Sequence, residues 1–468
     1  MSADQPTVDT LITGGTLVTA DAVYPADIGI SDGKIRWIGR SGDPADAREH
    51  IDATGRLVIP GGVDPHVHLE ATSQGQRTAD DFTSGTEAAV LGGTTTVIDF
   101  AYQQEGLSLA DSIAERRALA EGFAVTDFAF HLVLKHLDEA HLSELRAVVA
   151  DGTCSFKIYL AYPRRGLMAD DATLFRALDF ARQLGAVCLV HAENGVVNDV
   201  LVDRAVAAGS ISPAQHELTR PAGSEVEGTF RALALARLAG AAVYFVHVSS
   251  ADSLAEILRA RQRGQAAMGE TCIHYLTMDR AKYDLPGFEP AKYVMNPPLR
   301  GADDVAALWT ALQLGQLQVV STDHCPFDFI GQKDAGASNF ALIPNGVPGI
   351  RHRIELLYSE GVARDRISLS QWVSLIATGP ARIMGLARKG RLHVGADADI
   401  AIFDPDARWR ITQASHDMHV DYSVYEGHEV TGRVDHVLRR GEVIVRDREL
   451  AADVTRGRYV PRHNPALL

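Results

Sequence analysis

Cysteine is scarce in this sequence. The four cysteines among 468 residues, Cys154, Cys188, Cys272 and Cys325, are widely spaced and include no Cys-x-x-Cys pair. This spacing indicates neither a disulfide framework nor a cysteine-based zinc site. Basic residues are also outnumbered, with 45 Lys and Arg against 60 Asp and Glu, and no basic block stands out. The net charge of −15 therefore argues against a nucleic-acid partner.

Long apolar runs are missing as well. No uninterrupted apolar segment approaches the roughly 20 residues that a membrane-spanning helix needs, so we expect no membrane partner. Residues 1–6 lack the basic and apolar regions of a secretory signal peptide. Hydrophobic residues make up 46% of the chain, which is enough for a large core. We therefore expect a globular cytoplasmic protein.

Both ends of the chain have the pattern of short β-strands. Near the N-terminus we predict strands at residues 9–13, 16–19, 26–31 and 34–39, with Asp32-Gly33 as a type I′ hairpin turn. Near the C-terminus we predict strands at 399–403, 435–439 and 442–446, with Arg440-Gly441 as a turn. Each end is too small to hold a core alone. We predict that residues 1–57 and 385–468 form one composite β-sandwich domain, with the tail after about residue 450 as a docking arm.

The middle of the chain, residues 58–384, alternates apolar strands with helical stretches. Near-continuous apolar strands with crossover helices are typical of a parallel sheet. We predict eight strands, at residues 57–60, 95–100, 127–133, 155–160, 186–191, 242–247, 265–270 and 317–322. We predict helices at 80–91, 110–121, 171–184, 227–239 and 253–263. Eight such units predict an α/β fold, a (β/α)₈ TIM-like barrel.

Several predicted strands end in residues that can bind a metal. His66 and His68 follow the first strand, and residues i and i+2 of a strand point to the same face. In a barrel of this kind the chemistry lies at the carboxyl ends of the strands. The other candidates at strand ends are His191, His247 and Asp323. A single histidine at a strand end is usually structural, but five matching positions indicate a metal site, suited to zinc, manganese or cobalt.

Other polar residues near these strand ends fit the set less well. His131 and His274 are interpreted as structural or supporting residues, and no role is assigned to His324 or Cys325. Lys157 lies within an apolar strand, where an unpaired ammonium is costly to bury. It is either a lysine that reaches solvent or an ion pair, or it is chemically modified.

The whole pattern resembles the amidohydrolase superfamily, and within it the cyclic amidases dihydropyrimidinase and hydantoinase. The matching segments run over nearly the whole chain: Gly61-Gly-Val-Asp-Pro-His-Val-His68, Gly92-Gly-Thr-Thr-Thr-Val-Ile-Asp-Phe100, Phe156-Lys-Ile-Tyr-Leu-Ala-Tyr162, His191-Ala-Glu-Asn194, His247-Val-Ser-Ser250, Asn296-Pro-Pro-Leu-Arg300, Pro344-Asn-Gly-Val-Pro-Gly349 and Asp421-Tyr-Ser-Val-Tyr-Glu-Gly427.

The resemblance implies a site with two divalent metal ions, with Zn²⁺ expected and Mn²⁺ or Co²⁺ as alternatives. It implies that His66, His68 and Asp323 hold one ion and that His191 and His247 hold the other. It further implies that Lys157 is carboxylated and bridges both ions, and that the protein is a homotetramer. A carbamate fits the physics, because it turns a buried cation into an anion between two cations.

The activity that the resemblance implies is ring opening of dihydropyrimidines or 5-substituted hydantoins to N-carbamoyl amino acids. A metal-bridging hydroxide would attack the cyclic amide, with Asp323 as the proton shuttle. Tyr162 would donate a hydrogen bond to the oxyanion. Tyr162, Asn296 and Asn345 would bind the substrate.

Two positions depart from the family pattern. Asn296 stands where the family usually has Ser before Pro-Pro-Leu-Arg, and Glu70 places a charge in a loop expected to face substrate. Dihydroorotases resemble this chain but have an arginine at the position of Glu70, where it binds a substrate carboxylate; Glu70 therefore argues against an acidic substrate. Allantoinase, acting on a cyclic ureide, stays possible. A non-catalytic scaffold is disfavoured because all six ligand positions are intact. We expect the specificity of this protein to lie at Glu70.

Overall fold

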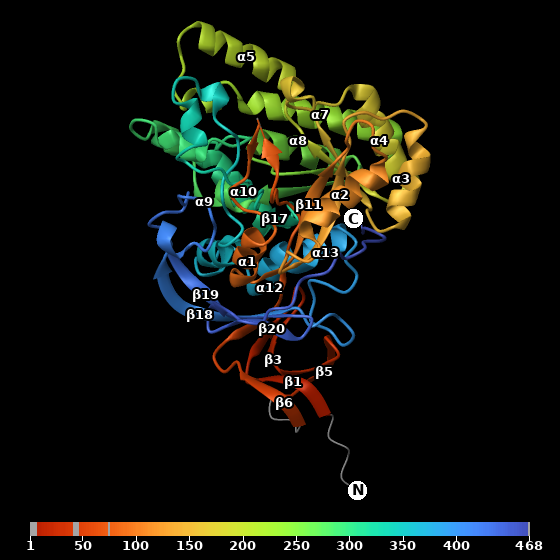
Figure 1. Ribbon diagram of the computed structural model, residues 1–468, viewed down its shortest axis with the longest axis vertical. Helices are drawn as coiled ribbons and strands as arrows, with labels where there is room; N and C mark the ends of the chain where they lie inside the picture. Colours follow the sequence, from red (N-terminus) through yellow and green to blue (C-terminus); the bar gives the residue numbers. More distant parts are fainter. Residues whose placement is uncertain (1–6, 41–45, 74, 467–468) are drawn as a thin grey trace.

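The computed structural model describes residues 7–40, 46–73 and 75–466, so residues 1–6, where no signal peptide is expected, lie outside it. Its centre is an eight-stranded parallel sheet that curls into a nearly closed barrel (Figure 1). In sheet order the strands are β8 (Gly62–Asp64), β11 (Thr94–Tyr102), β12 (Asp127–Val133), β13 (Ser155–Tyr159), β14 (Val187–His191), β15 (Val243–Phe245), β16 (Ala267–Cys272) and β17 (Val319–Ser321). The last strand approaches the first through a parallel bridge between Val67 and His324. The predicted barrel is confirmed.

Helices follow the strands and surround the barrel (Figure 1). They are α1 (Ser84–Leu91), α2 (Leu109–Ala120), α3 (His141–Ala150), α4 (Asp171–Leu184), α5 (Gly195–Ala207), α6 (Gln215–Leu218), α7 (Ala222–Ala239), α8 (Ala251–Gln262), α9 (Ile273–Thr277), α10 (Ala302–Gln313), α11 (Arg353–Leu357), α12 (Leu369–Val373) and α13 (Gly379–Ile383). The predicted helix α4 has the expected end signals. The Asp170 carboxylate accepts a hydrogen bond from the Thr173 N–H at 2.7 Å, and Gly185 ends the helix in the left-handed region.

One predicted barrel strand is wrong. Leu57–Pro60 forms β7, which pairs with the C-terminal strand β18 (Ile400–Arg410) and with β2 (Thr16–Val18) of the second domain. The barrel begins only at Gly62. The apolar run continues from β7 of the second domain into β8 of the barrel, so hydrophobic periodicity does not show where one sheet ends and the other begins. Gly61 lies at the transition, where a Cβ would come within 2.4 Å of the Thr95 side chain.

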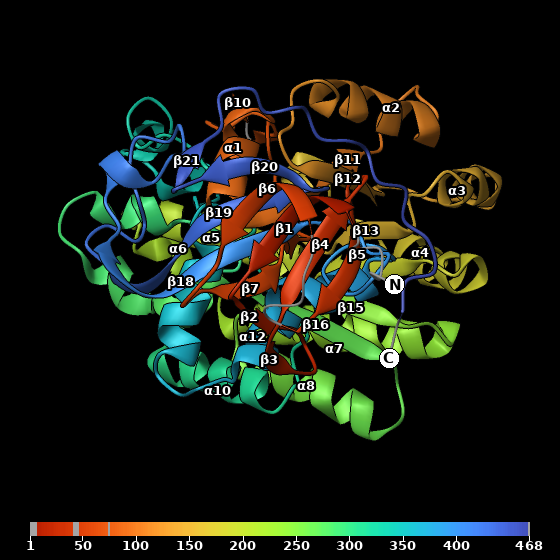
Figure 2. The ribbon, with the colours of Figure 1, turned by 90° about the horizontal axis from the view of Figure 1, so that it is seen from below.

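Both chain ends contribute to a pair of sheets beside the barrel. A four-stranded sheet has the order β5-β4-β1-β6, and a seven-stranded sheet has the order β21-β20-β19-β18-β7-β2-β3. Figure 2 shows the N-terminal strands lying over the C-terminal ones. The remaining strands are β1 (Thr7–Thr13), β3 (Val23–Pro25), β4 (Asp27–Ser31), β5 (Lys34–Gly39), β6 (Asp46–Asp52), β19 (Glu429–Arg439), β20 (Glu442–Arg446) and β21 (Glu449–Leu450). Their shared core includes Ile28, Val58, Ile400 and Leu438, so the composite sandwich is confirmed.

Two predicted hairpin turns have the expected backbone. Asp32 and Gly33 have φ of 53° and 71°, and Arg440 and Gly441 have φ of 48° and 76°. Positive φ at both central residues is typical of a type I′ turn. Strand β6 escaped prediction, because most of its side chains are polar; it pairs in parallel with β1. The domain boundaries after residue 57 and before residue 385 stay a prediction.

The C-terminal tail docks on the chain's own barrel. Val460 N–H donates to the Phe128 carbonyl at 2.8 Å, and the buried Arg462 donates to Ser155 Oγ at 2.7 Å. Lys389 makes a second link, since its buried ammonium lies 2.5 Å from Asp127 of β12 and 2.7 Å from Asp399, next to β18. These contacts tie the two domains together. Within the described part of the chain, no helix has the length and hydropathy that crossing a membrane requires.

Candidate metal centre

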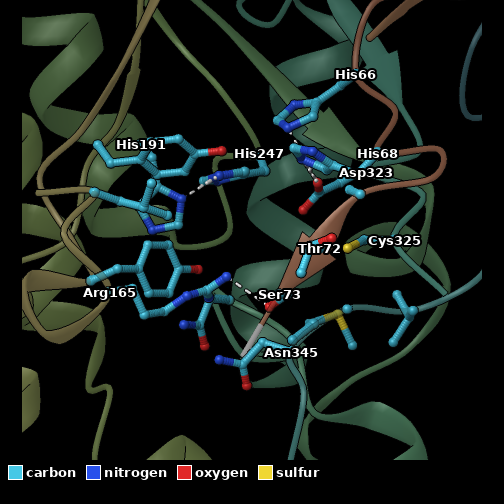
Figure 3. A pocket seen from close by; sticks show the side chains of 18 of the residues that line it. His66, His68, Thr72, Ser73, Arg165, His191, His247, Asp323, Cys325 and Asn345 are labelled. Atoms are coloured by element: carbon cyan, nitrogen blue, oxygen red, sulfur yellow. Dashed lines mark hydrogen bonds and ion pairs between the residues drawn. The ribbon is translucent and has the colours of Figure 1, made fainter. Parts of the chain in front are cut away.

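The six predicted ligands come from five places on the barrel rim. His66 and His68 follow β8, Lys157 lies on β13, and His191 ends β14. His247 follows β15 and Asp323 follows β17. Figure 3 shows His66, His68, His191, His247 and Asp323 pointing into one cavity. The convergence that parallel-strand geometry predicts is therefore present.

The candidate ligand atoms lie close to one another. His66 Nε2 and His68 Nε2 are each 3.2 Å from Asp323 Oδ1. His247 Nε2 is 2.9 Å from His191 Nδ1. One ligand atom from each of His66, His247 and Asp323 falls within 4.8 Å of the others. The group of His66, His68 and Asp323 therefore lies next to the pair of His191 and His247.

Carboxylates hold the outer nitrogens of two of these histidines. His66 Nδ1 is 2.5 Å from Glu270 Oε1, and His191 Nε2 is 2.7 Å from Glu193 Oε2. A carboxylate on the far ring nitrogen is typical of metal-binding histidines, because it fixes the tautomer that leaves the near nitrogen free to bind. Neither glutamate was predicted. His191-Ala-Glu193 carried the signal for one of them, since residues i and i+2 share a face.

Burial keeps the histidines in the form that binds metals. It lowers the pKa of His68 and of His191, and it holds the pKa of His247 well below the ordinary value. A neutral imidazole has a free lone pair at neutral pH. For Asp323, burial favours the neutral acid, but His66 and His68 outweigh it and hold the pKa of the carboxyl below its ordinary range. The carboxylate is therefore ionised.

Lys157 is buried without a partner. Its side chain is fully enclosed, and its Nζ has no hydrogen-bond partner among the described residues. The Nζ lies 5.1 Å from the Tyr159 ring centre and 5.4 Å from that of Phe100. Burial lowers the pKa of Lys157 to about 7. Of the alternatives for Lys157, neither contact with solvent nor an ion pair occurs among the described residues.

These donors fit divalent metal ions. Neutral imidazoles and one carboxylate are the ligand types that zinc and similar metals select. An unpartnered buried amine in the same cavity is costly as it stands and needs a further group beside it. The donor set therefore fits a metal site.

Backbone strain gathers at this rim. Tyr162, His247 and Asp323 have φ of 65°, 40° and 48°, in the left-handed region that non-glycine residues rarely adopt. Such conformations persist only where the surroundings enforce them, and they gather at functional sites. Two of the three are predicted ligands and the third is the predicted oxyanion donor.

The cavity next to the ligands is lined by all three predicted substrate-binding residues, Tyr162, Asn296 and Asn345. Burial raises the pKa of Tyr162 above its ordinary value, so its hydroxyl keeps its proton. The Asn296 side-chain oxygen is buried without a hydrogen-bond partner among the described residues. The Tyr162 hydroxyl and the Asn296 side-chain oxygen can therefore form hydrogen bonds with a small polar molecule in the cavity.

The histidines set aside in the sequence are buried and separate from the ligand set. His131 binds Ser155 Oγ at 2.7 Å and the Pro65 carbonyl at 2.8 Å, which fixes the residue before His66. His324 Nδ1 accepts the Gly349 N–H at 3.1 Å. Neither ring nitrogen of His274 has a partner among the described residues, and burial lowers its pKa to about 4.

Cys325 lines the cavity. Burial raises the pKa of its thiol far above the ordinary value. The thiol therefore stays protonated at neutral pH, and only a thiolate is a good nucleophile. This fits the absence of an assigned catalytic role.

Glu70 lies in the loop that was expected to face substrate. It does not line the cavity beside the ligands, and its carboxylate is paired with Arg77. The chain turns at Glu70, which has φ of 48°, so its side chain faces a neighbouring outer cavity. The side chain therefore does not face the metal-ligand group directly, and the expectation that its charge faces substrate stays a prediction.

Two supporting residues could not be found from spacing. Asp64 accepts the Thr322 hydroxyl at 2.6 Å, which joins the first barrel strand to the last beside the ligands. Lys333 is fully buried, and its Nζ donates to the carbonyls of Val294 and Pro344 at 3.1 and 3.2 Å. It thereby holds together the loops that carry Asn296 and Asn345.

Comparisons with known proteins agree over the whole chain. The amidohydrolase family model matches residues 57–444, and that of the urease alpha-subunit N-terminal domain matches residues 1–62. A D-hydantoinase of Geobacillus stearothermophilus is 47% identical over 454 residues, covering 97% of this chain and 96% of that protein. The crystal structure of dihydropyrimidinase from Brevibacillus agri has a TM-score of 0.95 at 45% identity, covering 98% of this chain and 99% of that one. A D-hydantoinase structure from a Bacillus species has a TM-score of 0.94 at 46% identity, covering 97% and 99%.

Proposed function

This chain belongs to the amidohydrolase family, and on that premise we propose that it opens the cyclic amide bond of 5-substituted hydantoins or dihydropyrimidines. The products are N-carbamoyl amino acids. The observation that carries the proposal is the convergence of His66, His68, His191, His247 and Asp323 on one cavity with an unpartnered lysine. Full-length relatives named D-hydantoinase support the substrate class.

Two divalent ions, with Zn²⁺ expected, would be held by this chain. His66, His68 and Asp323 would hold one, and His191 and His247 would hold the other. When bound, the ions would lower the pKa of a water molecule and polarise the amide carbonyl of the substrate. Glu270 and Glu193, bound to the outer nitrogens of His66 and His191, would keep these rings oriented.

Asp323 would move the proton. Its carboxylate is ionised and stands at the centre of the ligand group, so it can accept a proton from the attacking water. It would then donate that proton to the ring nitrogen as the C–N bond breaks. The water oxygen ends on the former amide carbon as a carboxylic acid, and the nitrogen leaves as part of the carbamoyl group.

Tyr162 would stabilise the oxyanion. Its hydroxyl keeps its proton and lies in the cavity wall, with its ring centre 5.1 Å from that of His191. A donor of this kind is commonly worth about 2.7–4 kcal/mol in the transition state. Asn296 and Asn345 would bind the ring amide from the opposite loops.

Lys157 would carry a carboxylate group. Carboxylation of a lysine needs its neutral amine, which adds to carbon dioxide and releases one proton. A pKa of about 7 provides that neutral amine. The carbamate would supply two oxygen ligands between the ions. It would also replace a buried cation, which repels metals, with an anion that attracts them.

We further propose that the protein is a homotetramer in the cytoplasm. Apolar side chains stand exposed on α5 and α7: Val196, Val197, Val200, Phe230 and Leu238. Exposed apolar groups of this kind are common at subunit interfaces. All four cysteines are free, as a reducing compartment maintains. Light scattering after gel filtration measures the assembly, and a monomer would contradict it.

The function is tested with a substrate panel. Protein purified without chelator is assayed for ring opening of hydantoin, phenylhydantoin, dihydrouracil, dihydrothymine, allantoin and dihydroorotate, with metal content measured on the same sample. We expect close to two transition-metal ions per chain and turnover of hydantoins or dihydropyrimidines. Turnover of allantoin alone, or an active protein without metal, would refute the proposal.

A further inference from the structure

Arg165 lies on the wall between two cavities. The inner cavity holds the ligand group, and Arg165 lines it together with Tyr162 and Thr72. A larger outer cavity adjoins it, of about 740 Å³ against about 60 Å³, and Arg165 and Thr72 line this one as well. A ring that reaches the ligands therefore fills the inner space, and a substituent on that ring has the outer cavity to extend into.

The guanidinium of Arg165 is held in place but has no counter-ion. It donates to Ser73 Oγ at 2.7 Å, and its Cζ lies 4.6 Å from the Tyr162 ring centre (Figure 3). No carboxylate of the described residues lies within ion-pair distance of it. Since a guanidinium has five N–H donors, most of its donors stay available on the cavity wall.

The other charges that line the outer cavity cancel, so its one net positive charge is that of Arg165. Glu70 is neutralised by Arg77, and Arg116 is neutralised by Asp99 at 2.6 Å. Lys135 lines the same cavity, and no ion pair of its ammonium occurs within the described ranges. The remaining acid, Glu115, is exposed at the rim and binds the Gln104 amide at 2.5 Å.

We propose that Arg165 is a specificity-determining residue that binds a carboxylate on the 5-substituent of the ring. The natural substrate class is then a hydantoin or dihydropyrimidine with an acidic side chain, and the product is the N-carbamoyl derivative of an acidic amino acid. This rests on the proposed function. A guanidinium prefers a carboxylate because the charge-assisted hydrogen bonds are paired and planar. Glu70 does not oppose this, since its charge is already compensated.

The test compares two ligands that differ only in charge. Catalytic efficiency is measured for 5-(2-carboxyethyl)hydantoin and for its amide, 5-(2-carbamoylethyl)hydantoin, at pH 7.5 on the metal-loaded enzyme. Calorimetry measures the affinity of the corresponding products, N-carbamoylglutamate and N-carbamoylglutamine. We expect the acid to be preferred by about tenfold in both measurements, as one charge-assisted contact in a partly exposed site provides. If the wild-type ratio of acid to amide is one or less in these measurements, the proposal is overturned without the need for any variant.

Two variants separate Arg165 from general charge effects. Arg165→Gln should abolish the preference for the acid over the amide, while Arg165→Lys should keep part of that preference. Arg164→Gln is the matched control, because the neighbouring Arg164 pairs with Asp199 and Asp203 away from the cavity. If Arg165→Gln prefers the acid over the amide as strongly as the wild type does, the proposal is overturned. Failure to open any ring, including unsubstituted hydantoin, refutes the proposed function instead, and the calorimetric ratio still decides the role of Arg165.

Discussion

Replacing Lys157 by Met should stabilise the metal-free protein while abolishing its activity. In the absence of ions and of carbon dioxide, Lys157 is an amine that is fully buried without a partner. The unfolded chain exposes it to water, where it binds a proton readily. Folding therefore costs free energy at neutral pH, and a methionine of similar length removes that cost.

The magnitude follows from the pKa. Burial lowers the pKa from 10.5 to about 7, and each tenfold change in proton affinity is worth about 1.4 kcal/mol, which gives at most about 5 kcal/mol. Water entry and relaxation reduce this, so we expect about 2–5 kcal/mol. The sign is fixed by linkage: the unfolded state binds more protons between pH 7 and 10.5. The cost is fully present below pH 7, shrinks as the pH rises, and vanishes above about 10.5.

The assay is thermal unfolding of chelator-treated protein in buffer free of carbon dioxide, at pH 7 and at pH 9.5. Lys157→Met should unfold at a higher temperature than wild type at pH 7, and the difference should narrow at pH 9.5. Lys389→Met is the matched control, because this buried lysine is paired with Asp127, Asp397 and Asp399. Its loss leaves the buried Asp399 without an ion pair among the described residues, and breaking a buried pair in this way typically costs about 3–5 kcal/mol. The reasoning would be refuted if Lys157→Met unfolded at a lower temperature than wild type at pH 7. It would also be refuted if the difference in unfolding temperature were the same at pH 7 and pH 9.5.

Three further substitutions have defined outcomes. Asp323→Asn should fold normally but lose about 10²–10⁴-fold in kcat, because the proton carrier is gone; an unchanged kcat would remove it from the mechanism. Glu70→Gln should leave kcat/KM for hydantoin within twofold, since its carboxylate is paired outside the inner cavity, and a tenfold loss would contradict this placement. Lys333→Met should raise KM about tenfold with a smaller change in kcat, because the substrate-binding loops lose a shared donor; a change in kcat alone would argue against that role.

The convergence of the candidate ligands was predictable from sequence because strand geometry fixes it. In a parallel barrel every strand presents its carboxyl end to the same rim, which brings His191, His247 and Asp323 together. His66 joins them from β8, which begins just after the strand predicted at residues 57–60. His68 was predicted to lie beside His66 because residues i and i+2 of a strand point to the same face. Errors of a few residues at strand ends did not affect this prediction, since the candidate histidines and Asp323 lie at or just beyond those ends.

The remaining features depend on where the chain turns and on contacts between distant segments. The turn at Glu70 directs its side chain away from the inner cavity, and no pattern of hydrophobic residues records that. Arg165 and Ser73 are brought together by two loops from different strands. Leu57–Pro60 reads as a barrel strand, yet its partners belong to the other domain. Sequence spacing describes single segments well, and it contains no information on which loops meet.

The pairing of β7 with β18 has a consequence for the synthesis of this protein. Pro60 pairs with Ile400, about 340 residues later, so one edge of β7 has no partner until most of the chain has been made. At roughly 5–20 residues per second, a ribosome needs on the order of 20–70 s to supply it. An unpaired apolar strand is a template for pairing with other chains. During that interval, the unpaired edge of β7 is open to pairing with nascent copies made on the same messenger RNA.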